Sequence, residues 1–312
     1  MDFDEPMDRD ALLWVADVAG ISVGVHAADD RYAATARGRL GASSTAAAPA
    51  LQLRLGPEVP WPPEALEVVN VEGYQGWSDG DRLWMGDDEM VVRVEADQVV
   101  VGGPIQNGHQ EDRFDDLVQF GIAAAVARPD QMMLHAAVVS RGDAAMLLVG
   151  RSGAGKSTLA GAALVGGWDL LGDDLCVYRP DDGTIEAVFR TPYVPREIAD
   201  RYGLLGTPEG GDRGRVQLPV DLLATGRRRL VGIVSVSHGS DGAVAVGSAG
   251  DLSVFDDALP GPPFPYVLRR YLRAVGTFLD IPAVQLEHAV DIDRRVPRAI
   301  ELLDEAWAQF GQ

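Results

Sequence analysis

Lysine is almost absent from this 312-residue chain, because all but one of its 27 lysine and arginine residues are arginine and only Lys156 is a lysine. Cysteine is equally scarce, and Cys176 is the single example. One cysteine excludes an internal disulfide and suits a reducing cytoplasm. No apolar run reaches the ~20 residues of a membrane-spanning helix, and the acidic first residues lack the basic and apolar pattern of a secretory signal. These absences predict a soluble, cytoplasmic protein.

Basic residues are also few in comparison with acidic ones. The chain carries 47 Asp and Glu residues, which gives a formal net charge of −20. A protein that binds nucleic acid needs a basic surface to neutralise phosphates, and an anionic membrane surface makes the same demand. We therefore expect neither a nucleic acid nor a membrane as a partner.

The pattern of apolar runs divides the chain into two parts. Residues 1–112 contain short apolar runs separated by Gly, Pro and Asp turns, which predicts a β-rich N-terminal domain that binds a substrate or partner. Residues 113–312 alternate strand-like and helix-like segments. That alternation predicts a second domain of the α/β class.

The one lysine lies in a glycine-rich segment that runs from Gly150 to Ser157. The apolar run Ala144–Val149 before it predicts a buried strand, and Ser157–Val165 predicts a helix. This is the pattern of a phosphate-binding loop (P-loop), in which backbone N–H groups wrap phosphates and a lysine reaches the terminal oxygens as a point charge. A planar guanidinium is too broad for that position, which explains why a chain almost free of lysine keeps one here.

We therefore predict that this segment binds a nucleoside triphosphate, with the hydroxyl of Ser157 as a ligand of Mg²⁺. The alternative is a glycine-rich turn that only mimics the motif. The predicted nucleotide-binding residues are Gly150, Arg151, Ser152, Gly153, Ala154, Gly155, Lys156, Ser157 and Thr158.

Two adjacent aspartates, Asp173 and Asp174, come directly after the next predicted strand, Trp168–Gly172. Ligands of open α/β sheets bind outside the carboxyl ends of the strands, so we expect both carboxylates near the loop. Neighbouring side chains at a strand end point in different directions, so that one can hold Mg²⁺ while the other accepts the proton of an attacking hydroxyl. The alternative is a pair of solvated turn aspartates.

His135 in the run Leu134–Val139, the loop Gly150–Thr158 and the sequence Gly172-Asp173-Asp174 together resemble the HPr kinase/phosphorylase family and its HPr-kinase-like relatives. Those proteins share a P-loop core related to phosphoenolpyruvate carboxykinase. The resemblance is strong over Gln131–Tyr178 and weak over Arg229–Ser237 and Ile281–Leu303. It implies an ATP-dependent kinase that phosphorylates a serine or another hydroxyl on a peptide, protein or small molecule.

The resemblance also implies roles for individual residues and cofactors. Asp173 corresponds to the catalytic base, Asp174 to a supporting acid near the metal, and His135 to a histidine that approaches the reacting phosphate. Lys156 joins them as the catalytic cation, with ATP and Mg²⁺ as cofactors. The runner-up function is a nucleotide-binding regulator or a slow NTPase.

The sequence departs from true HPr kinases after the aspartates. Residues Phe189–Arg196 do not carry the signature that precedes the HPr-binding elements, and the N-terminal region also differs. We therefore expect an acceptor other than HPr. Divergent relatives of this type include peptide-tailoring kinases such as lasso-peptide kinases. Members of the family often form oligomers, so a homo-oligomer stays an open alternative.

Overall fold

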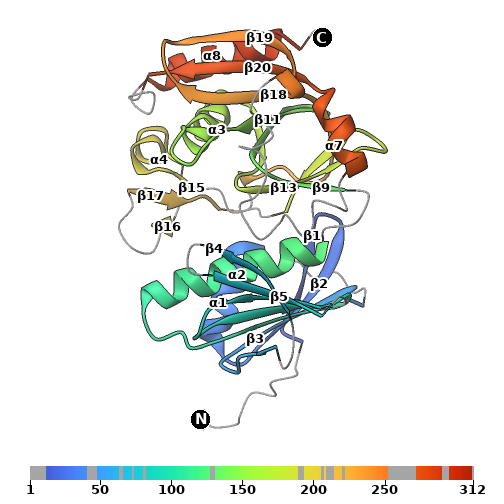
Figure 1. The fold of residues 1–312 in the computed structure, drawn as a ribbon. Coiled ribbons are helices and arrows are strands. Elements are labelled where there is room, and N and C mark those ends of the chain that lie inside the picture. Colours follow the sequence, from blue (N-terminus) through green and yellow to red (C-terminus); the bar gives the residue numbers. More distant parts are fainter. Residues whose placement is uncertain are drawn as a thin grey trace. The chain divides into compact units, whose positions relative to one another are not determined.

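The chain forms two compact units, Met1–Ala127 and Arg128–Gln312, each built on its own sheet (Figure 1). The computed structural model describes residues 12–40, 48–62, 66–71, 74–79, 82–126, 131–188, 193–204, 207–208, 214–219, 222–251, 272–289 and 295–310. Within these ranges, no helix combines the length and the apolar character that a membrane crossing requires.

The first unit is an eight-stranded mixed sheet with the order β1-β2-β3-β8-β7-β6-β5-β4. Strands β2, β3 and β8 run parallel, and the other neighbouring pairs are antiparallel. This sheet lies in the part of the chain for which the sequence predicts a β-rich domain. Its strands are β1 (Trp14–Val18), β2 (Ile21–Ala27), β3 (Leu51–Gly56), β4 (Leu66–Val71), β5 (Tyr74–Ser78), β6 (Leu83–Gly86), β7 (Val91–Val94) and β8 (Gln98–Gly102).

Two helices pack on this sheet, α1 (Asp30–Leu40) against β2 and α2 (Gly108–Val126) against β7 and β8. A Cβ on Gly121 of α2 would lie 2.5 Å from a side-chain carbon of Val99, so the helix and the sheet approach very closely there. The unit therefore extends to Ala127, and the predicted boundary after residue 112 is wrong because α2 belongs to this core.

The second unit is built on a nine-stranded mixed sheet with four helices among its described residues. Its path is β12-β10-β11-β18-β14-β13-β9, and β20 joins β18 and carries β19. The strands are β9 (Met132–His135), β10 (Ala137–Arg141), β11 (Ala144–Val149), β12 (Asp169–Gly172), β13 (Leu175–Arg179), β14 (Thr184–Ala187), β18 (Arg228–His238), β19 (Gly242–Ser248) and β20 (Pro282–His288).

The remaining elements of this unit are its helices, a 3₁₀ turn and a small three-stranded sheet of order β15-β17-β16. They are α3 (Lys156–Val165), α4 (Arg196–Tyr202), α7 (Leu272–Leu279), α8 (Val296–Ala308), η2 (Ala249–Asp251), β15 (Tyr193–Pro195), β16 (Thr207–Pro208) and β17 (Arg215–Gln217).

Strand β11 shows why this sheet is covered on both faces. All six of its residues are buried, and alternate side chains enter different cores because successive residues of a strand point to opposite faces. Met146 and Leu148 join a core with residues of α3 and α8. Leu147 and Val149 join a second core that includes Phe278 of α7. The predicted α/β layering is therefore present around this strand.

The apolar run Met133–Val139 forms parts of two strands. Its residues alone indicate a single strand, but the structure has β9 and β10 with a break at Ala136. The backbone N–H of Ala136 donates instead to the carbonyl oxygen of Asp174 at 3.0 Å. The partner strands break at the same point, because β10 pairs with β12 and β9 pairs with β13. These two strand pairs form a two-stranded ribbon that bends at the predicted acidic pair, Asp173 and Asp174.

Candidate functional site

The glycine-rich segment forms a loop between β11 and α3, and α3 begins at Lys156. Gly155 is the N-cap of α3 at φ 99°, a conformation that L-residues rarely adopt. Gly150 also has a positive φ of 152°, and a Cβ there would lie 2.5 Å from the carbonyl oxygen of Val236. Glycine is therefore needed at both ends of the loop.

Lys156 is buried, with only 7% of its surface exposed. Its Nζ donates to the carbonyl oxygen of Gly150 at 2.7 Å and lies 3.5 Å from that of Arg151. The ammonium is therefore turned back over the loop rather than extended into solvent. The N-cap of α3 makes no side-chain hydrogen bond, so the positive end of this helix faces the loop without a capping side chain.

Strand directions bring the other predicted residues to the same edge of the sheet. β10 is antiparallel to both β11 and β12, so β11 and β12 run in the same direction. β18 is parallel to β11, and β20 is parallel to β18. The carboxyl ends of these four strands therefore lie at one edge, which is where α/β sheets bind ligands. The loop follows β11 at this edge, and Asp173 follows β12.

His135 and Asp174 meet at the bend of the ribbon. His135 pairs in register with Leu175 of β13, directly beside Asp174. Its Nδ1 lies 3.0 Å from Oδ1 of Asp174, and the two side chains are 35% and 37% exposed. Asp173 next to them is only 7% exposed. The sequence therefore identified residues that the fold brings together, although they are far apart along the chain.

Asp174 has an unusual backbone for a non-glycine residue. Its φ is 96°, a region in which a Cβ crowds the neighbouring peptide, and such conformations cost about 1–3 kcal/mol. They persist where the surroundings hold them, and they concentrate at functional sites. The bend between β12 and β13 imposes this conformation while it keeps the carboxylate beside His135.

Two further histidines, His238 and His288, end β18 and β20 at the same edge, and sequence reasoning assigned them no role. The Nε2 atom of His288 lies 2.7 Å from the carbonyl oxygen of Ala154, and that of His238 lies 3.1 Å from the carbonyl oxygen of Gly153. No local motif marks either histidine, and the pairing of β11 with β18 and of β18 with β20 brings them to this edge.

Oxygen ligands suited to Mg²⁺ are present at this edge. Mg²⁺ is usually held by one or two protein oxygens together with substrate phosphates and water. Ser157 in the first turn of α3 and Asp174 offer a hydroxyl and a carboxylate. Within the described ranges, no three His, Cys, Asp or Glu side chains gather in a way that could hold a metal ion alone. This donor set fits a cation that arrives with a phosphate ligand.

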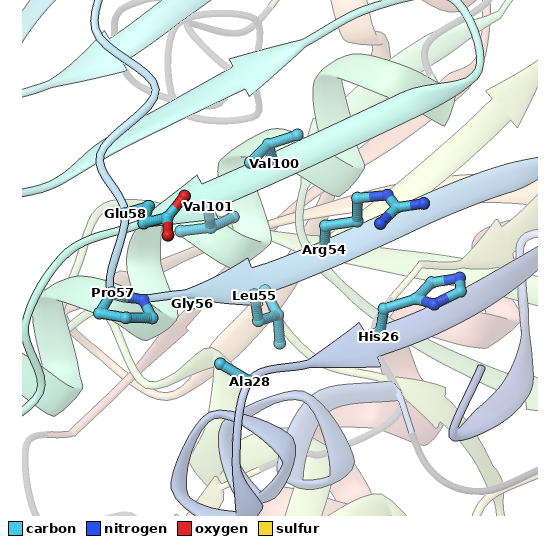
Figure 2. Close-up of a pocket in the computed structure, with 9 residues that line it drawn as sticks. All are labelled: His26, Ala28, Arg54, Leu55, Gly56, Pro57, Glu58, Val100 and Val101. Atoms are coloured by element: carbon cyan, nitrogen blue, oxygen red, sulfur yellow. The ribbon is translucent and has the colours of Figure 1, made fainter. Parts of the chain in front are cut away.

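A separate pocket lies on the sheet of the first unit (Figure 2). His26, Arg54 and Val100 come from β2, β3 and β8 and are cross-strand partners, so they share one face of the sheet. Nε2 of His26 lies 2.6 Å from Oε1 of Gln52. Glu58 also lines the pocket. A lining that holds both an arginine and a glutamate favours neither an anion nor a cation.

The sequence was compared with known families, curated proteins and solved structures. No model of a known protein family matches the sequence, and no curated protein matches it. Among solved structures, a match is found to the Hpr(Ser) kinase/phosphatase from Coxiella burnetii, at 11% identity and a TM-score of 0.27, over 57% of this chain and 95% of that chain. A match at this TM-score carries no weight for fold or function.

Proposed function

We propose that this protein is an ATP-dependent phosphotransferase that moves the terminal phosphoryl group of ATP to a serine or another hydroxyl of a peptide, protein or small molecule. The observation that carries the proposal is the buried Lys156 in its glycine-rich loop, at the sheet edge that also holds Asp173 and the His135–Asp174 pair. The resemblance of these same segments to HPr-kinase-like proteins supports a kinase with a P-loop core of that type.

The loop supplies the groups that a triphosphate needs. Backbone N–H groups around Gly155 and the uncapped start of α3 favour an anion. Lys156 now donates to the carbonyl oxygen of Gly150. On ligand binding, we expect its ammonium to exchange this carbonyl for the β- and γ-phosphate oxygens, which are stronger acceptors because they are charged. Burial keeps that charge from being screened by water.

Transfer requires a base and a second cation. In the proposed step the acceptor oxygen bonds to the γ-phosphorus, the bond from that phosphorus to the bridging oxygen breaks, and ADP leaves. Asp173 accepts the hydroxyl proton as the nucleophile attacks. Ser157 and Asp174 would hold Mg²⁺, whose chemistry is to neutralise phosphate charge. His135 lies beside Asp174 and keeps its carboxylate oriented through the 3.0 Å contact.

A transfer assay tests this function directly. The full chain is incubated with Mg²⁺, ATP labelled on its terminal phosphate and serine-containing peptides encoded beside it. Label on a peptide supports the phosphotransferase. Release of free phosphate without labelled peptide indicates the slow NTPase instead. Neither product, together with no ATP binding by calorimetry, contradicts the proposal.

Variants at Lys156 and Asp173 separate binding from chemistry. We expect Lys156→Ala and Lys156→Arg both to abolish detectable binding or turnover, because the site needs a slim ammonium and not charge alone.

Asp173→Asn retains ATP binding but loses transfer by roughly 100-fold or more, the usual contribution of a general base. The matched control is Asp169→Asn, an exposed aspartate at the opposite end of β12, which leaves transfer unchanged. An unchanged rate in Asp173→Asn refutes its assignment as base.

A further inference from the structure

Two histidines from neighbouring strands lie against the glycine-rich loop. β18 and β20 are parallel, and His238 is directly opposite His288 in their register. The two rings are in edge contact, with centroids 4.9 Å apart and an angle of 81° between their planes. His288 is fully buried, whereas His238 is exposed. The sheet therefore presents an imidazole pair to the loop from two adjacent strand ends.

The contact of His288 with the loop is tight. Its Nε2 lies 2.7 Å from the carbonyl oxygen of Ala154. A Cβ on Gly155 would lie 2.4 Å from the same nitrogen, so the ring occupies the space that any other residue at position 155 would need. The imidazole thus contacts two successive loop residues, and it does so from 134 positions further along the chain.

This contact fixes the direction of one peptide group. The peptide bond is planar and trans, so the C=O of Ala154 and the N–H of Gly155 point to opposite sides. With the carbonyl directed at His288, the N–H of Gly155 points away from the histidine. The preceding N–H, that of Ala154, already donates to the carbonyl oxygen of Arg151 at 3.0 Å. The N–H of Gly155 is therefore the loop donor whose orientation depends on His288.

The ring itself is held from its other side. Nδ1 of His288 lies 2.8 Å from the carbonyl oxygen of Ala289. The N–H of Ala289 donates to Asp241, whose other oxygen lies 2.6 Å from a guanidinium nitrogen of Arg295. The hydrogen bond from Ala289 and the nearby Arg295 lower the pKa of Asp241, so it stays a charged acceptor. A chain of contacts thus runs from Arg295 to the loop.

We propose that His288 is a positioning residue of the phosphate site: Nε2–H donates to the carbonyl oxygen of Ala154 and so aims the N–H of Gly155 at a phosphate oxygen of the ligand. His238 supports it by the same kind of contact with Gly153, at 3.1 Å. This inference rests on the proposed function, because it assumes that the loop binds a polyphosphate. A carbonyl oxygen only accepts, so the contact with Ala154 requires a proton on Nε2, and the contact with Ala289 is a hydrogen bond only if Nδ1 also carries a proton.

Two substitutions of His288 test the role. Gln can donate from its amide to the carbonyl of Ala154, whereas Phe fills the space but has no donor. ATP affinity is measured by titration calorimetry with Mg²⁺, and thermal unfolding without ligand reports the fold. We expect His288→Phe to bind ATP about 10-fold more weakly or worse, as for a lost hydrogen bond to a charged ligand. His288→Gln stays within about threefold of wild type, and His238→Phe shows a smaller loss than His288→Phe.

A spectroscopic measurement keeps the inference testable if a variant fails to fold. Long-range ¹H–¹⁵N correlation on the wild-type protein identifies which ring nitrogens of His288 carry a proton. The proposal expects a protonated Nε2, and an Nε2 without a proton overturns it.

The binding data also separate this inference from the proposed function. Suppose that wild type binds ATP. If His288→Phe binds ATP equally well, or if His288→Gln binds it as weakly as His288→Phe, the proposed role of His288 is wrong and the proposed function stands. If wild type binds neither ATP nor inorganic triphosphate, both are overturned.

Discussion

At the scale of single residues, we expect the backbone conformation of Asp174 to lower the stability of the fold, while its carboxylate is needed for phosphoryl transfer. Its φ of 96° strains any residue with a Cβ, and its contact with the half-exposed His135 is worth less than about 1 kcal/mol. We therefore expect Asp174→Gly to raise the free energy of unfolding by about 1 kcal/mol. The same change removes the carboxylate and should abolish phosphoryl transfer. Chemical denaturation and the transfer assay measure the two effects.

Matched variants control this prediction. Ala19 is the other described non-glycine residue with a positive φ, at 49°, and it lies in the first unit. Ala19→Gly should therefore leave transfer unaffected. Asp174→Asn keeps a residue that tolerates this region of the backbone, so it should lose transfer without gaining stability. A less stable Asp174→Gly protein would show that the side chain, not the backbone, dominates at this position.

Single residues differed in how far the sequence revealed them. Lys156, Asp173 and His135 lie in recognisable local motifs, so the sequence alone predicts roles for them, and those roles remain predictions. His238 and His288 carry no such motif. Their partners are backbone carbonyls 85 and 134 positions away, and only the parallel pairing of β18 with β20 brings them to the loop.

At the scale of elements, the turn from β11 into α3 depends on Gly155. Gly155→Ala combines a strained φ of 99° with a Cβ 2.4 Å from the ring of His288. The φ term costs about 1–2 kcal/mol, and the overlap adds to it. We expect the double variant Gly155→Ala/His288→Ala to recover the steric part only, so the two substitutions are not additive. Denaturant unfolding of the two single variants and the double variant measures the coupling.

Gly142 provides the control for this double-mutant cycle of Gly155→Ala and His288→Ala. It turns β10 into β11 at φ 57°, and a Cβ there meets nothing within 4 Å. Gly142→Ala should therefore show the φ penalty alone and no coupling to His288→Ala. Strict additivity of the Gly155 cycle would mean that the ring moves aside at no cost, and it would argue against a firm contact with the loop.

Elements were predictable where burial imposes a simple pattern. The apolar run Ala144–Val149 matches β11, because a strand buried on both faces needs apolar residues throughout. Helix α1 is not evident from the sequence, since its small and basic residues give little amphipathic pattern. Its clearest signal is the cap, because the N–H of Arg31 donates to Asp29 at 2.8 Å. The division at Ala136 could not be seen, because it depends on a hydrogen bond to Asp174.

At the scale of the whole molecule, the sequence suggested two domains but misplaced their boundary. The end of the β-rich region looked like the natural division, yet α2 completes the core of the first unit. Its Phe114 and Tyr32 of α1 are in edge contact with centroids 5.2 Å apart. The hydrophobic pattern of α2 shows that it covers apolar surface, but it cannot show which sheet supplies that surface.

Two units with separate cores should respond differently to ligand. The loop and Asp173 belong to Arg128–Gln312, so ATP with Mg²⁺ should stabilise this unit first. At a free ligand concentration 100 times Kd, binding adds about 2.7 kcal/mol. We expect calorimetry to resolve two transitions, of which ATP shifts one, and hydrogen exchange to assign that transition to the second unit. Lys156→Ala is the control and should show no shift. If ATP moves a single transition for the whole chain, the units unfold together, and nucleotide binding is coupled to the first unit as well.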